Sequence, residues 1–101
     1  MKTYKRKFKE ELEQMDWVDV ISLIEYYKNS LNSVAIGSSV NEDPIAIIGG
    51  IKYFKIKGDG LLCIAMSGSY VKIPKKSFKY AIRTDIAIDI YCNKFLYSIV
   101  F

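Results

Sequence analysis

The sequence has no histidine, and only two of its 101 residues are cysteines. Without histidine, the chain lacks the most common general acid or base of enzymes and the most common transition-metal ligand. Cys63 and Cys92 lie in separate apolar stretches, and such isolated cysteines are usually buried, reduced thiols. We therefore expect no metal and no cofactor.

Long apolar runs are absent as well. The apolar runs are short, such as residues 45–48 and 61–66, whereas a membrane-spanning helix needs about 20 apolar residues. The basic residues 1–9 are followed by acidic residues instead of the apolar stretch of a signal peptide. These absences predict a soluble, cytoplasmic protein without a membrane partner.

The sequence also lacks the arrangements that support catalysis. Asp85 and Asp89 fall on one face of an expected strand, but about 13 Å apart, too far to act on one bond. The glycines flanking Asp59 lead into a strand, whereas the glycine-rich phosphate-binding loops lead into a helix. We therefore expect that this protein is not an enzyme.

Charge is distributed unevenly along the chain. Residues 1–9 carry five bases and no acid, residues 10–44 carry eight acids and one base, and residues 45–101 carry nine bases and three acids. The three segments thus have net charges of +5, −7 and +6. Half of the residues are hydrophobic and 26% are charged, which is typical of a globular chain, so we expect one domain over residues 1–101.

The first third of the chain has the apolar spacing of a helix. Phe8, Leu12 and Met15 recur every three or four residues, and a second apolar set begins at Val20. Asp16 precedes that second set in the position of an N-cap residue. The pattern predicts a helical segment over residues 1–32, bent or split near Asp16.

Short strands are expected over residues 33–101. Gly49 and Gly50 separate two apolar runs and predict a tight hairpin between them, and further turn clusters divide the rest. We expect an α+β fold in which the N-terminal helix packs on a strongly bent antiparallel sheet of five to six strands, or on a small barrel. This order of elements resembles in outline the small Sm-like and SH3-like barrels, but the chain carries no Sm-type motif.

The last strand is apolar on both faces, so both faces need cover. The sheet can curl into a barrel, it can fold over as a sandwich, or another chain can cover it. If another chain provides this cover, the strand is a partner or self-association surface, made of Phe95, Leu96, Tyr97, Ile99, Val100 and Phe101. With catalytic groups absent, the leading hypothesis is a protein-interaction module, forming a homo-oligomer and binding and blocking a protein partner. Inhibitors and immunity proteins of phages and mobile elements are often small domains of this kind.

Basic and aromatic residues alternate in the strand region, which supports a second hypothesis. Sheets that bind single-stranded nucleic acids combine stacking aromatic side chains with bases that neutralise phosphates. The candidate contacts to nucleic acid, or to a nucleotide or other anion, are Lys52, Tyr53, Lys55, Tyr70, Lys72, Lys79 and Arg83. However, Phe54 alternates with Lys55, which also fits an aromatic core face opposite a solvated lysine face.

Overall fold

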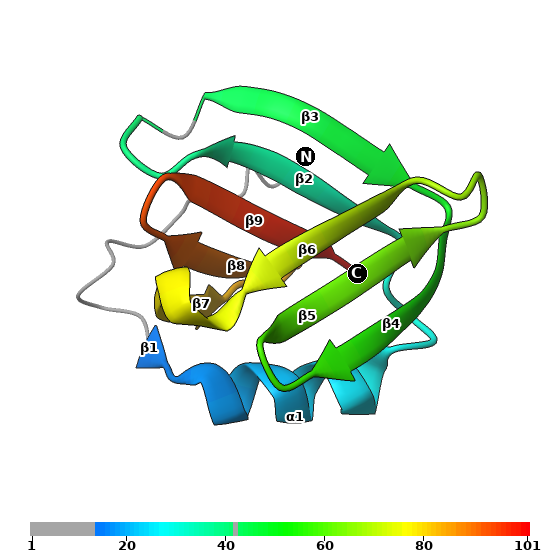
Figure 1. Cartoon of the computed structure of the whole chain (residues 1–101), viewed down its shortest axis with the longest axis horizontal. Coiled ribbons are helices and arrows are strands. Elements are labelled where there is room, and N and C mark those ends of the chain that lie inside the picture. The colour runs from blue at the N-terminus through cyan, green and yellow to red at the C-terminus, as the bar shows by residue number, and fades with distance from the viewer. Residues whose placement is uncertain (1–13, 42) are drawn as a thin grey trace.

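The computed structural model describes residues 14–41 and 43–101, where it has one α-helix and nine strands in two antiparallel sheets (Figure 1). In chain order, the elements are β1 (Gln14–Met15), α1 (Trp17–Tyr27), β2 (Ser33–Ser38), β3 (Pro44–Gly49), β4 (Ile51–Lys57), β5 (Gly60–Ala65), β6 (Tyr70–Pro74), the 3-10 helix η2 (Lys75–Ser77), β7 (Phe78–Arg83), β8 (Ala87–Cys92) and β9 (Phe95–Val100). The expected α+β class is therefore confirmed.

The two sheets form separate layers. The larger has six strands in the order β1-β7-β8-β9-β2-β3, and the smaller has three in the order β4-β5-β6. Figure 1 shows the smaller sheet in front of the larger one, with α1 running along the lower end of both. The expectation of one sheet of five to six strands, or a small barrel, was wrong in strand count and closure, because the chain divides its strands between two layers.

The helix begins at a capping box. The Asp16 carboxylate accepts a hydrogen bond from the Asp19 backbone N–H, and the Asp19 carboxylate accepts one from the Asp16 N–H. The expected N-cap at Asp16 is thus confirmed, whereas the expected helix before it was wrong for Gln14 and Met15, which form a strand paired with β7. The part of the expected helix over residues 1–13 lies outside the described residues.

The expected hairpin at Gly49 and Gly50 was wrong. Strand β3 pairs with β2, and β4 pairs with β5, so the chain turns a corner here from the larger sheet into the smaller one. Gly50 has a φ angle of +61°, which glycine adopts without strain. Ile48 and Ile51, on the two sides of this corner, both pack against the same core.

The core lies between the two sheets and α1. Val20 and Ile24 of the helix, Leu61 and Cys63 of the smaller sheet, and Ile88 of the larger sheet are among its fully buried members. Burial raises the pKa of both cysteine thiols, Cys63 and Cys92, to about 11. Both thiols are therefore protonated at neutral pH and pack as small apolar side chains.

Strand β5 has a close backbone contact at Gly60. A Cβ atom added there would lie 2.5 Å from the backbone oxygen of Ile73 on β6, closer than two such atoms can approach. Gly58, two residues earlier in the same turn, has no atom within 4 Å of an added Cβ. Of these two glycines, only Gly60 is required by its surroundings.

We expect Gly60→Ala to reduce the free energy of unfolding by about 1–3 kcal/mol, because the added methyl group must push β6 away from β5. Urea denaturation followed by circular dichroism measures this change. Gly58→Ala is the matched control and should change stability by less than about 0.5 kcal/mol. Equal effects of the two substitutions would contradict the close contact.

Candidate nucleic-acid interface

The smaller sheet has one face in the core and one face in solvent. Along β5, Leu61, Cys63 and Ala65 are buried, whereas Leu62 and Ile64 between them are only half-buried. Because side chains alternate along a strand, Leu62 and Ile64 belong to the opposite, solvent-exposed side of the sheet. We call this side the outer face, and its members are Tyr53, Lys55, Lys57, Leu62, Ile64, Tyr70, Lys72 and Pro74.

Strand register arranges the outer face in two neighbouring rows. Ile64 pairs with Tyr53 on β4 and with Tyr70 on β6, which gives a row with an aromatic ring at each end. Leu62 pairs in the same way with Lys55 and Lys72, which gives a row with an ammonium group at each end. Tyr53 is 46% exposed and Tyr70 is 68% exposed, so both rings are accessible.

A β-bulge at Lys52 determines which side chains of β4 face solvent and which face the core. Ile51 pairs with Ala65 and Tyr53 pairs with Ile64, so β4 has one extra residue between two consecutive residues of β5. In a regular strand, residues two apart share a face, so Tyr53 would share the buried face of Ile51 if β4 had no bulge. With it, Tyr53 and Lys55 face solvent, while Phe54 packs against the core.

The region around the outer face is strongly basic. Residues 51–80 contain seven lysines and a single acidic residue, Asp59. The Asp59 carboxylate lies in the β4–β5 turn and accepts a hydrogen bond from Lys72 Nζ at 2.5 Å. This hydrogen bond is the largest cause that lowers the pKa of Asp59 below its ordinary value.

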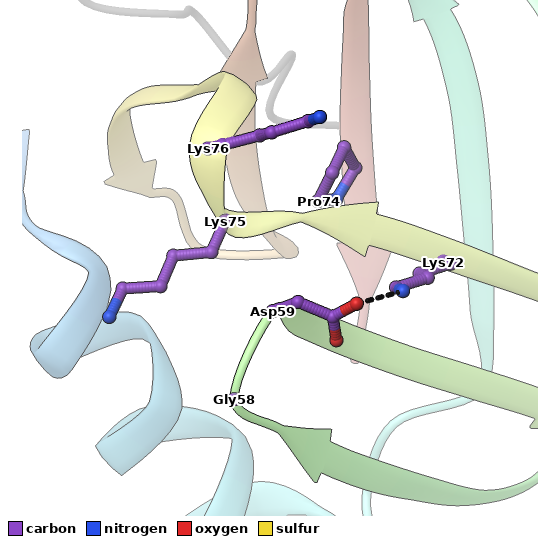
Figure 2. Close-up of a pocket in the computed structure, with 6 residues that line it drawn as sticks. All are labelled: Gly58, Asp59, Lys72, Pro74, Lys75 and Lys76. Carbon is purple, nitrogen blue, oxygen red and sulfur yellow. Dashed lines mark hydrogen bonds and ion pairs between the residues drawn. The ribbon is translucent and has the colours of Figure 1, made fainter.

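One end of the outer face opens into a cleft of about 620 Å³, which we call the lysine cleft. The described residues that line it are Gly58, Asp59, Lys72, Pro74, Lys75 and Lys76. Figure 2 shows Lys72 joined to Asp59, while Lys75 and Lys76 extend from η2 in different directions, Lys75 toward α1 and Lys76 past Pro74. The cleft therefore lies where the β4–β5 turn meets the end of β6.

Sequence reasoning found part of this site and missed the rest. Of its candidates, Tyr53, Lys55, Tyr70 and Lys72 come together on the outer face, and Lys52 lies exposed at the bulge beside them. Lys57, Lys75 and Lys76 belong to the same basic and aromatic pattern of the sequence, but they were not among the candidate contacts. It also missed Leu62 and Ile64, which form the apolar centre of the two rows.

Lys79 and Arg83 lie elsewhere, on β7 of the larger sheet. Arg83 donates a hydrogen bond to the Tyr27 hydroxyl at 3.2 Å, and its guanidinium carbon lies 5.0 Å from the centre of the Tyr27 ring and 5.4 Å from that of Phe101. These interactions tie α1 to the end of the chain. Neither residue joins the outer face.

The terminal strand lies inside the larger sheet, between β8 and β2. Leu96, Tyr97 and Ile99 are each at most 7% exposed, and Val100 and Phe101 are half-buried, which leaves Phe95 as the most exposed member of the expected surface at 41%. The structure thus covers most of this strand within the chain itself. The reason for expecting a partner on that strand no longer applies.

Two further kinds of site are absent from the described part of the chain. Residues 14–41 and 43–101 contain no cluster of three or more cysteine, aspartate or glutamate side chains suited to a metal ion. No helix among the same residues has the length and apolarity to cross a membrane. No known family model, curated protein or solved structure matches this chain.

We expect Lys72→Gln to raise the pKa of the Asp59 carboxyl group, because it removes the main hydrogen bond to the ionised form. In the unmodified protein this bond is present at neutral pH and breaks as the pH falls through the lowered pKa. Carboxyl chemical shifts measured by NMR across an acid titration give the pKa directly. Lys79→Gln is the control and should leave it unchanged; an unchanged value in Lys72→Gln would contradict the pairing.

Proposed function

We propose that this protein binds single-stranded nucleic acid on the outer face of its smaller sheet. The observation that carries the proposal is the pair of exposed rows, tyrosine–isoleucine–tyrosine beside lysine–leucine–lysine. Adjacent strands lie about 4.8 Å apart, so the two rings of one row are about 10 Å from each other. An unpaired strand can place bases on the rings and phosphates beside the lysines.

The binding mode follows from the kinds of side chain present. Tyr53 and Tyr70 offer ring faces on which any base can stack, and Leu62 and Ile64 provide an apolar surface between them. The lysines act as compact charges that neutralise phosphates without reading base identity. The described face thus favours unpaired over duplex nucleic acid, with little preference for base sequence.

Fluorescence anisotropy with a labelled single-stranded oligonucleotide at low salt tests the proposal. We expect Tyr53→Ala combined with Tyr70→Ala to weaken binding about tenfold or more, because stacking contributes about 1–3 kcal/mol per base. Lys55→Gln should reduce the slope of log affinity against log salt concentration by about 0.7, because it leaves one phosphate without its neutralising ammonium group.

Matched controls come from residues outside the outer face. Tyr26 on α1 is 79% exposed, so Tyr26→Ala removes an exposed ring without touching the sheet, and Lys79→Gln removes an exposed lysine from β7. Neither control should change affinity by more than about twofold, apart from the small loss of long-range attraction that Lys79→Gln causes by removing one charge. Absence of binding at low salt to both RNA and DNA single strands would refute the proposal.

Self-association is the second candidate function, and a different strand supports it. Among the described residues, strand β3 is an edge of the larger sheet and is paired only with β2. Its Ile45 and Ile47 are 60% and 70% exposed, and none of its residues is charged. Natural edge strands usually carry charges or prolines that prevent pairing. In β3 only the first residue, Pro44, is of this kind, so residues 45–49 suit hydrogen bonding to β3 of a second copy.

We expect Ile47→Lys to abolish any dimer, because a charge on the exposed edge opposes strand pairing. Multi-angle light scattering over a range of protein concentrations measures the mass in solution. Val18 on α1 is equally exposed at 69%, so Val18→Lys is the control that should leave the mass unchanged. A monomer at all concentrations in the unmodified protein would rule this candidate out.

A further inference from the structure

The lysine cleft continues the outer face at one end. Lys72 belongs to both, since it closes the lysine row of the outer face and also lines the cleft. The volume of about 620 Å³ lies within the range of about 300–1,000 Å³ that is usual for small-ligand sites. A single nucleic-acid strand that lies along the outer face therefore reaches the lysine cleft where the sheet ends.

The charges in the cleft match a doubly charged anion. Among the described residues that line the cleft, Lys72, Lys75 and Lys76 contribute three positive charges and Asp59 one negative charge, a net charge of +2. A phosphate monoester carries about −1.5 to −2 at neutral pH, whereas a phosphate diester within a strand carries only −1. The charge of the cleft thus suits the end of a phosphorylated strand better than its interior.

A bound anion can rearrange the lysine side chains of the cleft. The Asp59 carboxylate accepts a hydrogen bond from the ammonium group of Lys72. Figure 2 shows the side chains of Lys75 and Lys76 extending away from one another. Lysine has a flexible four-carbon stem, so its ammonium group can swing toward a bound anion. A phosphate group competes with the Asp59 carboxylate for Lys72 because both accept hydrogen bonds from the same ammonium group.

We propose that the lysine cleft binds the terminal phosphate of a single-stranded nucleic acid whose neighbouring nucleotides lie on the outer face. Lys72, Lys75 and Lys76 neutralise the phosphate, and Asp59 releases Lys72 when the phosphate enters. This assignment rests on the proposed function, in which the rest of the nucleic-acid strand binds on the outer face. It adds recognition of a strand end.

The test compares one oligonucleotide sequence in three forms, with a 5′-phosphate, with a 3′-phosphate or with hydroxyl groups at both ends. We expect one phosphorylated form to bind about tenfold more tightly than the hydroxyl form, since the lysines form charge-assisted hydrogen bonds with the terminal phosphate. Comparing the 5′ and 3′ forms identifies which strand end enters the cleft.

Variants of the full chain separate the cleft from the outer face. Lys75→Gln combined with Lys76→Gln should remove the preference for the phosphorylated form, while Asp59→Asn should strengthen that preference because the competing carboxylate is gone. Lys28→Gln combined with Lys79→Gln removes the same charge from exposed positions elsewhere and should keep the preference. A preference retained without Lys75 and Lys76 would overturn the assignment.

Failure of this inference is distinguishable from failure of the proposed function. Equal affinity for all three oligonucleotides would overturn the cleft assignment and leave binding on the outer face intact. If no oligonucleotide binds, adenosine 5′-monophosphate is the remaining probe, followed by NMR shifts of residues 75 and 76. Shifts confined to the cleft would support the phosphate site and refute the proposed function, and absence of shifts would refute both.

Discussion

The β-bulge at Lys52 decides which side chains of β4 face solvent. In a regular strand, residues two apart share a face, and a bulge exchanges the two faces for the residues that follow it. In β4 the exchange places Phe54 against the core and Tyr53 and Lys55 on the outside. The aromatic and basic rows of the outer face depend on this exchange, and so does the proposed binding of single-stranded nucleic acid.

At Gly50 the chain passes from the larger sheet into the smaller sheet, which then covers the inner face of the larger one. This corner between β3 and β4 brings Leu61 and Cys63 over the core opposite Ile88. The larger sheet thus gains an apolar layer in front and α1 at one end, and the inward side chains of β9 become interior. Cover of this inner face requires no second chain.

Electrostatics links the two proposed parts of the binding surface. Lys72 lies between the outer face and the lysine cleft, and Asp59 is the only acidic side chain within this basic region of the sequence. A carboxylate at this position reduces the attraction of the cleft for weakly charged anions, because any ligand must compete for Lys72. A terminal phosphate has the charge to do so, and a single internal phosphate has less. One carboxylate can therefore supply selectivity without any contact to a base.

The sequence by itself determined the α+β class, the N-cap at Asp16 and several of the turns, because apolar spacing, capping residues and glycines act over a few neighbouring residues. It also indicated Tyr53, Lys55, Tyr70 and Lys72 as one set of candidates. Only the tertiary structure decided which strands pair, because pairing depends on contacts between distant residues: β3 joins β2 and not β4, and β9 is interior. Those same long-range pairings create the bulge at Lys52, and with it the face on which the four candidates meet.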